Sequence, residues 1–295
     1  MKPWILAARP KTLGAAIAPV LVGSVLGWKL SGEFCVWLML ATLASCMCLQ
    51  IATNLFNDAL DSIKGSDTKE RLGPVRITAS GMMPPQTVMR VAAGVLVVAT
   101  MLALPLLWYR GWPIIAIGIP SLYFCFGYTG GPMPLAYRGL GELFVVIFFG
   151  LIAVTGSAFV QSGDWHIEAV VLGLQIGMLS TVLIAINNYR DIEEDTKTGK
   201  RTLAVRFGKT FARWETRGLM LGAVLLNGYW MLFADASFAS AALRSSVTFP
   251  LIVMIGYDIA KEPSHALNKT LAKAGALLLL FSLLWCSAFV FNLGR

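Results

Sequence analysis

The sequence predicts an all-α membrane protein in which nine transmembrane helices surround a central cavity. Two observations on composition support this class: 57% of the 295 residues are hydrophobic and only 14% are charged. A soluble domain carries about 25% charged residues, and the mean hydropathy of this chain is +0.70. A third observation is that long apolar stretches cover almost the whole chain. We therefore expect a single polytopic domain over residues 1–295.

A transmembrane helix is predicted wherever roughly 20 mostly apolar residues occur together. Nine stretches meet this condition, at about 12–29, 35–56, 87–108, 112–129, 140–161, 168–189, 211–233, 238–257 and 271–292. Several contain proline, which bends membrane helices and is tolerated where neighbouring helices support the bend. The polar segments between these stretches are then loops on the two membrane faces.

Lysine and arginine residues are distributed very unequally between those two faces. With the N-terminus inside, 20 of the 24 lie in inner segments, and the outer segments hold Lys29, Arg110, Arg244 and Arg295. Basic residues collect on the cytoplasmic side of membrane proteins. We therefore expect a multi-pass protein of the inner (cytoplasmic) membrane with a cytoplasmic N-terminus. The net charge of +8 has the same explanation and does not indicate nucleic-acid binding; no obligate protein partner is inferred.

The first of two acidic segments lies at the inner end of the second predicted span. It contains Asn54, Asn57, Asp58 and Asp61 and is followed by Lys64. If the helix continues through this segment, residues three or four positions apart line one face over two turns. The segment is thus expected to present several oxygen ligands in one direction.

The second acidic segment follows the sixth predicted span. Asn187, Asp191 and Asp195 recur at intervals of four, which predicts one helix face. Each acidic segment is followed by lysine and glycine, and the second segment comes four spans after the first. The recurrence predicts two pseudo-repeated four-helix units plus one helix.

Carboxylates beside hydrocarbon are costly, so they usually mark a functional site. Carboxylate and amide oxygens suit a hard cation, and Mg²⁺ is typically bound by a few carboxylates together with substrate phosphates. We predict that four aspartates are catalytic and that these with one asparagine bind Mg²⁺: Asp58, Asp61, Asp191, Asp195 and Asn57. The alternative is helix capping, but two matched segments on one membrane face favour a site.

A diphosphate held by Mg²⁺ also needs polar and cationic partners. The candidate substrate-binding residues are Asn54, Lys64, Arg76, Tyr128, Arg138, Asn187, Asn188, Lys200 and Arg201. For the basic ones, the alternative is the general enrichment of inner loops. Glu142 either complements a helix dipole or pairs with a basic site residue. Gln50 either faces the cavity or bonds to another helix.

Several inner-loop motifs resemble those of the UbiA superfamily of membrane prenyltransferases. They are Arg9-Pro10-Lys11-Thr12, the segment 54–67, Gly73-Pro74-Val75-Arg76, Tyr128-Thr129-Gly130-Gly131-Pro132, Tyr137-Arg138-Gly139-Leu140-Gly141-Glu142, and the segment 187–206. The resemblance implies nine helices around a cavity with a lateral opening to lipid. It also implies that Mg²⁺ bridges the two aspartate motifs and an isoprenoid diphosphate.

The segments 187–191 and 199–203 favour the naphthoate branch of this superfamily. The resemblance therefore implies transfer of a polyprenyl group to 1,4-dihydroxy-2-naphthoate, with loss of diphosphate and CO₂, to give demethylmenaquinol. The superfamily often has a third aspartate where this chain has Gly65, so the resemblance assigns Asp67 no role.

Two alternatives remain open at this point. The first is another UbiA-type enzyme whose acceptor is 4-hydroxybenzoate, haem or a chlorophyll precursor. The second is a secondary transporter, although transporters tend to bind substrate near the bilayer midplane, whereas these acids lie at one face. The active site is expected to face the cytoplasm.

Overall fold

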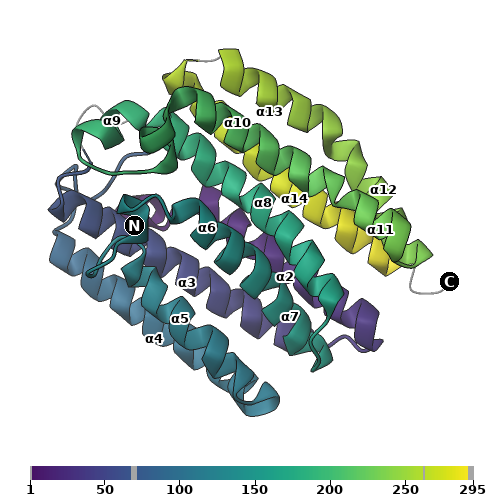
Figure 1. Ribbon diagram of the computed structural model, residues 1–295. Coiled ribbons are helices and arrows are strands. Elements are labelled where there is room, and N and C mark those ends of the chain that lie inside the picture. The colour runs from purple at the N-terminus through teal and green to yellow at the C-terminus, as the bar shows by residue number, and fades with distance from the viewer. Residues whose placement is uncertain (1, 68–71, 262, 292–295) are drawn as a thin grey trace.

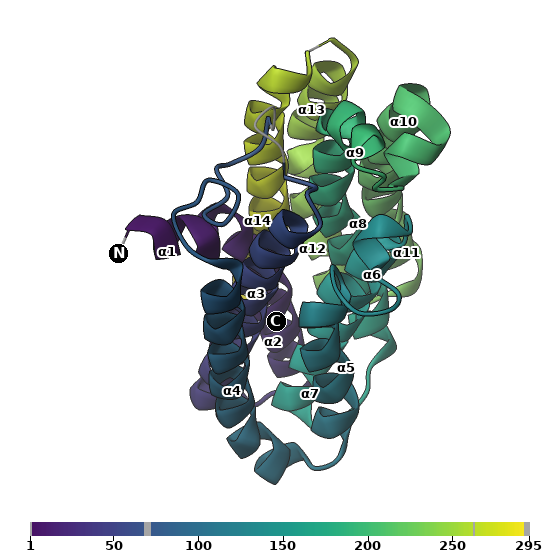
Figure 2. The same cartoon turned by 90° about the vertical axis from the view of Figure 1, so that its left-hand side faces the viewer.

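The computed structural model describes residues 2–67, 72–261 and 263–291, and no strand occurs among them. The long helices run side by side as one bundle (Figure 1). The short helix α9 lies at one end of this bundle, and the last turn of α14 lies at the other. The bundle therefore has an end that carries the loops after the acidic segments, and Figure 2 looks toward that side.

The first half of the chain supplies five α-helices, the short 3-10 helix η1 and a helix of mixed type. Their bounds are α1 Lys2–Ala8, α2 Pro10–Ser31, α3 Val36–Ile63, α4 Pro85–Arg110, α5 Pro113–Gly127, η1 Leu135–Tyr137, α6 Gly141–Val145, η2 Val146–Ile152 and α7 Ala153–Ser162. The three elements from Gly141 to Ser162 are continuous, and η2 is a π-helical stretch between two α-helical ones. Such stretches are rare and occur often near functional sites.

The second half begins with the well-buried helix α8. The bounds are α8 Ile167–Arg190, α9 Ile192–Lys197, α10 Leu203–Leu225, α11 Asn227–Phe233, α12 Ala236–Ser245, η3 Ser246–Thr248, α13 Phe249–Lys261, η4 Ser264–Ala266 and α14 Leu267–Phe291. In both views α13 lies on the opposite side of the bundle from α4 and α5 (Figures 1 and 2).

Seven helices among the described residues are long and apolar enough to cross a membrane. They are Pro10–Ser31, Val36–Ile63, Pro85–Arg110, Gly141–Ser162, Ile167–Arg190, Ala236–Lys261 and Ser264–Phe291, and each overlaps one predicted span. The span predicted at 112–129 corresponds to α5, which has 15 residues. The span predicted at 211–233 falls on α10 and α11, where Arg213, Glu215 and Arg217 make the helix more polar. The nine-helix count and the repeat stay predictions.

Glycines allow the π-helical stretch to approach α8 closely. A methyl group added at Gly150 would lie 2.4 Å from the carbonyl oxygen of Gly173 and 2.4 Å from the Cα of Gly177. Small residues at such crossings let helix backbones pack against each other inside a membrane. This contact fixes the position of the aromatic residues that η2 carries.

A buried polar network joins α8 to α10 and α11. Gln175 is fully buried, and its amide donates to the carbonyl of Ala223 at 2.7 Å and to Asn227 at 2.9 Å. The indole N–H of Trp230 donates to the Gln175 Oε1 at 2.7 Å. Because every polar group of the Gln175 side chain has a partner on α10 or α11, this residue holds the helices together.

Both acidic segments occur where long helices end. Helix α3 continues to Ile63, so the predicted continuation of the helix through the first segment is confirmed. Helix α8 stops at Arg190, and Asp191 is the joint between α8 and α9. Asn187 and Asp195 therefore lie on two consecutive helices that meet at Asp191, and the prediction that the three residues share one face stays a prediction. Hydrogen bonds from Asp191 to Asn187 and from Asp195 to Asp191 nevertheless keep the four-residue spacing.

Candidate functional site

Asp61 is the centre of the polar contacts in the first acidic segment. Its side chain is buried, and Oδ1 accepts a hydrogen bond of 2.8 Å from the hydroxyl of Tyr137. Its other oxygen lies 3.4 Å from Nη2 of Arg76. A buried carboxylate is stable only with partners of this kind. Arg76, predicted as a substrate-binding cation, is thus next to a predicted metal ligand.

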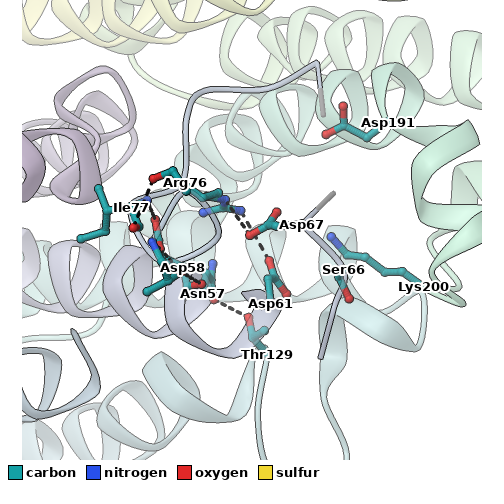
Figure 3. A network of polar contacts seen from close by, with 12 residues as sticks. Asn57, Asp58, Asp61, Ser66, Asp67, Arg76, Ile77, Thr129, Asp191 and Lys200 are labelled. Carbon is teal, nitrogen blue, oxygen red and sulfur yellow. Dashed lines mark hydrogen bonds and ion pairs between the residues drawn. The ribbon is translucent and has the colours of Figure 1, made fainter. Parts of the chain in front are cut away.

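Arg76 lies between two carboxylates. Its Nε is 3.3 Å from Oδ2 of Asp67, whose side chain is almost completely buried. After α3 ends, Gly65 adopts a positive φ of 68°, and the N–H of Ser66 donates to the carbonyl of Asp61 at 2.9 Å. Glycine adopts this conformation without steric cost. The turn brings Asp67 back toward Asp61, so the sequence analysis missed its place in the site (Figure 3).

Asp58 holds the loop that carries Arg76. Its carboxylate accepts hydrogen bonds from the backbone N–H of Ile77 at 3.1 Å and of Thr78 at 2.9 Å. The hydroxyl of Thr78 also donates to Asp58. Both oxygens are therefore engaged by the loop, although a metal and catalytic role had been predicted for this residue. That role stays a prediction, and the observed task of Asp58 is to anchor the loop.

The two asparagines of this segment differ in their surroundings. Asn57 accepts a hydrogen bond from the hydroxyl of Thr129, whose carbonyl oxygen accepts one from Lys64. Asn54 is buried, and its amide donates to the carbonyl of Ala8 at 2.9 Å and to the hydroxyl of Thr12 at 3.0 Å. Asn54 thus fastens the N-terminal helix, whereas Asn57 lies beside a predicted cation.

Tyr137, which the sequence analysis did not single out as a site residue, connects the two acidic segments. Besides Asp61, its hydroxyl contacts Oγ of Ser66 at 2.6 Å. The ammonium groups of Lys64 and Lys200 lie 4.2 and 5.9 Å from the centre of its ring. Cations are attracted to aromatic faces at such distances. Its position in an inner loop beside Arg138 was a signal that could have identified it.

Burial sets the protonation states around Tyr137. Burial, and next the charge of Asp61, raise the pKa of the Tyr137 hydroxyl above its ordinary value, so it stays a protonated donor at neutral pH. Burial lowers the pKa of the Lys64 ammonium, and the charge of Asp61 opposes that shift. The site therefore pairs a protonated phenol with a carboxylate.

The second acidic segment is held from two sides. Arg190 donates from Nε and Nη2 to the two oxygens of Asp191 at 2.7 and 2.6 Å, and from Nη1 to Asn268 at 2.7 Å. Oδ1 of Asp195 lies 3.8 Å from Nζ of Lys200. The forked contact is the geometry in which arginine binds carboxylates best. It fixes Asp191 relative to the start of α14.

The remaining predicted residues lie around this centre. Asn188 donates to Oε1 of the buried Glu142 at 2.6 Å, so Glu142 pairs with an amide among the described contacts. Tyr128 packs against Phe144, with ring centres 5.1 Å apart. The side chain of Asn187 is partly buried, and those of Arg138 and Arg201 are exposed. Their predicted contacts with substrate stay predictions.

Lys200 lies near both acidic segments, because its Nζ is 3.8 Å from Oδ1 of Asp195 and 5.9 Å from the ring centre of Tyr137, which donates to Asp61. In Figure 3 the Lys200 side chain reaches from the second segment toward Ser66 and Asp67 of the first. Within the described part of the chain, no three acidic, histidine or cysteine side chains are close enough to hold a metal alone. The oxygen donors present fit Mg²⁺, because this ion keeps waters and completes its shell with substrate phosphates.

An apolar cavity of about 170 Å³ begins beneath these polar groups. Thr53, one helical turn before Asn57, lines it near the acids, together with Gln50 and Phe144. Phe144 stacks on Phe148 of η2 with ring centres 4.4 Å apart. Gln50 therefore faces the cavity, and its amide also donates to Asn54 at 3.3 Å. A polar rim above an apolar chamber suits a ligand with an anionic head and a hydrocarbon tail.

Residues 16–265 match the UbiA prenyltransferase family, and the chain belongs to that family. It is accordingly a multi-pass integral membrane protein, in agreement with its apolar helices.

Curated relatives and solved structures agree with this assignment. The chain is 36% identical to a 1,4-dihydroxy-2-naphthoate octaprenyltransferase of Mycobacterium leprae over 76% of each chain. It is 31% identical to a protein of the same name from Haemophilus influenzae, over 97% of this chain and 94% of that protein. A UbiA homologue from Archaeoglobus fulgidus bound to GPP and Mg²⁺ has the same fold, with a TM-score of 0.71 and 14% identity over 97% and 99% of the chains.

Proposed function

We propose that this protein transfers a polyprenyl group from an isoprenoid diphosphate to 1,4-dihydroxy-2-naphthoate, releasing diphosphate and CO₂ and giving demethylmenaquinol. The observation that carries the proposal is that five relatives, 31–37% identical, are named for this acceptor. The geometry of the site also supports the proposal, because acidic and lysine side chains lie at one end of an apolar cavity.

Mg²⁺ is the cofactor that this function requires, and the A. fulgidus homologue was solved with Mg²⁺ and GPP. Asn57, Asp61, Asp191 and Asp195 would hold it. When bound, the ion offsets the negative charge that grows on the departing diphosphate. Asp58, engaged with Ile77 and Thr78, would support the site by holding the loop rather than by contacting the metal.

The protein's own side chains supply the remaining requirements. Lys64 and Lys200 carry positive charge on both sides of Tyr137 and would bind diphosphate oxygens. Tyr137 orients Asp61 by its hydrogen bond. The rings of Tyr128 and Phe144 would stabilise the allylic cation left by ionisation. The apolar cavity excludes water, which would otherwise capture that cation.

The orientation in the membrane is part of the proposal. Nine crossings of the inner membrane, with a cytoplasmic N-terminus and active site, leave 20 of the 24 lysines and arginines inside. In this arrangement the water-soluble acceptor and the diphosphate head would reach the acids from the cytoplasm. The prenyl tail would remain in the bundle and the bilayer.

The proposal is tested by an activity assay in which purified protein is incubated with Mg²⁺, a prenyl diphosphate and dihydroxynaphthoate. We expect diphosphate release together with a prenylated, decarboxylated product, and no product when 4-hydroxybenzoate replaces the acceptor. Asp61→Asn and Asp191→Asn should abolish turnover, whereas Asp164→Asn, an exposed acid on the loop before α8, should not. Wild-type rates in either site variant, or transfer to 4-hydroxybenzoate at an equal rate, would contradict the proposal.

A further inference from the structure

Two arginines of α10 lie at an edge of the bundle that the proposed reaction does not use. Arg213 and Arg217 are four residues apart, so they follow one another on one face of this helix. Helix α10 packs against α13, and the two helices lie side by side along the edge of the bundle that is remote from α4 (Figure 1). No residue of α10 or α13 lines the apolar cavity described above.

The two arginines contact only neutral groups of the protein. Nε of Arg213 donates to the hydroxyl of Tyr189 at 3.0 Å. Nε and Nη2 of Arg217 donate to the carbonyl oxygen of Gly256 at 3.3 and 2.8 Å. The other guanidinium nitrogens of both residues donate to no described group, and they are accessible at the surface. Two positive charges at this edge thus have no negative partner within the described part of the chain.

Two nearby lysines differ from the arginines in this respect. Nζ of Lys209, one turn before Arg213, lies 2.8 Å from Oε1 of Glu193. Nζ of Lys273 on α14 lies 2.7 Å from Oδ2 of Asp258 on α13. The general enrichment of basic residues in inner segments does not distinguish these lysines from the arginines, but their pairing does. A ligand that carries negative charge would therefore be drawn to the arginines.

Aromatic residues indicate that the arginines lie at the level of the lipid headgroups. The side chains of Trp214 on α10 and Tyr257 on α13 are 65% and 61% exposed. The guanidinium carbon of Arg217 lies 5.4 Å from the ring centre of Trp214. Tryptophan and tyrosine are enriched where a membrane meets water, and long basic side chains near helix ends extend to the same level.

Exposed apolar residues continue along both helices from this level. On α10, Leu221 and Leu225 follow Trp214 at the spacing of one helix face, and both are exposed. On α13, Val253 lies four residues before Tyr257 and is exposed as well. Because α10 and α13 run in opposite directions, all three lie on the same side of the arginines along the bundle axis (Figure 1). The edge thus joins a cationic end to an apolar strip.

We propose that the edge between α10 and α13 binds an anionic phospholipid. Arg213 and Arg217 hold its phosphate, and its acyl chains lie along the exposed apolar residues of the two helices. Arginine binds phosphate oxygens in a forked geometry, and charges beside hydrocarbon are costly without a partner. In the proposed orientation the arginines lie in the cytoplasmic leaflet, where anionic lipids attract basic residues. A zwitterionic lipid satisfies the arginines less well, because it carries a cation of its own.

A short-chain lipid separates headgroup recognition from general solvation by a bilayer. Dihexanoylphosphatidylglycerol is titrated into the purified full-length protein in a neutral detergent, and the rise in the midpoint of thermal unfolding gives an apparent Kd. Dihexanoylphosphatidylcholine and inorganic phosphate are titrated in parallel. The variants are Arg213→Gln/Arg217→Gln and the charge-preserving Arg213→Lys/Arg217→Lys. Arg90→Gln/Arg244→Gln is the matched control, because it removes two arginines from α4 and α12 instead.

We expect the apparent Kd for phosphatidylglycerol to rise by about tenfold or more in the glutamine pair. It should stay within about threefold of wild type in the lysine pair and in the control. Phosphatidylcholine and inorganic phosphate should produce no such saturable rise in the midpoint.

Four results would overturn the proposal. The first is wild-type affinity for phosphatidylglycerol in the glutamine pair. The second is an equal loss in the glutamine and lysine pairs, which would assign the effect to the broken contacts with Tyr189 and Gly256. The third is an equal rise with phosphatidylcholine or with inorganic phosphate. The fourth is a wild-type dimer in detergent that the glutamine pair dissociates, since a second copy of the chain would then cover this edge.

Discussion

The hydroxyl of Tyr137 donates a hydrogen bond of 2.8 Å to Oδ1 of Asp61. The tyrosine comes from η1 and the aspartate from the last turn of α3, so this contact joins two parts of the chain that are far apart in sequence. Because the pKa of the phenol is raised by burial and by Asp61, the hydroxyl remains a donor throughout the neutral range.

Tyr137→Phe should remove this orientation while keeping the ring between the lysines. Hydrogen bonds to charged groups contribute about 1.5–3 kcal/mol, and each ~1.4 kcal/mol is about tenfold in rate. We therefore expect kcat/KM to fall by about tenfold to a hundredfold in a steady-state assay. Tyr257→Phe, at an exposed position of α13, is the control. An unchanged kcat/KM for Tyr137→Phe would contradict the orienting role.

Asp58→Asn should release the loop that carries Arg76. The substituted amide has one acceptor oxygen, so a buried N–H of Ile77 or Thr78 loses its partner, at a cost of about 1–3 kcal/mol. We expect faster amide hydrogen exchange at residues 76–80 and lower activity. Exchange at wild-type rates in this loop, with activity lost, would instead favour a direct role for Asp58.

Some residues of the candidate site could be predicted from the sequence and others could not. The acids of α3 follow from helical spacing, because the helix does continue to Ile63. Asp67 could not be assigned, because its approach to Arg76 depends on the turn at Gly65. Asp58 and Asp61 occur in similar sequence contexts. They differ because Asp58 accepts hydrogen bonds from the backbone of Ile77 and Thr78, and that tertiary contact cannot be read from the sequence.

The fold was predictable to a similar extent. Apolar length identified seven helices among the described residues, since each is long and apolar enough to cross a membrane. The break at Asp191 was not predictable, because it accompanies the side-chain contacts of Arg190 with Asp191 and Asn268. The π-helical stretch at Val146–Ile152 has no signal in hydropathy, since its residues are as apolar as those of any span.

Gly150→Ala should destabilise the bundle. The added methyl group would overlap Gly173 and Gly177 of α8, and overpacking costs about 1–3 kcal/mol, more than the gain of about 1 kcal/mol in helix propensity. We expect a lower midpoint of thermal unfolding in detergent. Gly94→Ala, with open space around it, should be neutral or stabilising. Equal midpoints for the two variants would disagree with the tight packing of η2 on α8.

Chelation should stop the reaction reversibly. EDTA should abolish product formation, and added Mg²⁺ should restore it, because the bound ion offsets the negative charge that grows on the departing diphosphate. Ca²⁺ should restore activity poorly, since it prefers more ligands at longer distances. Full turnover after thorough removal of divalent ions would rule out the assigned cofactor.

The most direct test of the account is whether both acidic segments hold one donor diphosphate. Binding of a non-hydrolysable geranyl thiodiphosphate can be measured with Mg²⁺ and with EDTA for wild type, Asp61→Asn and Asp195→Asn. The account predicts that Mg²⁺ tightens binding to the wild type, and that either substitution weakens Mg²⁺-dependent binding by about tenfold or more. Wild-type affinity in either variant, with its full dependence on Mg²⁺, would contradict a diphosphate shared between the two segments.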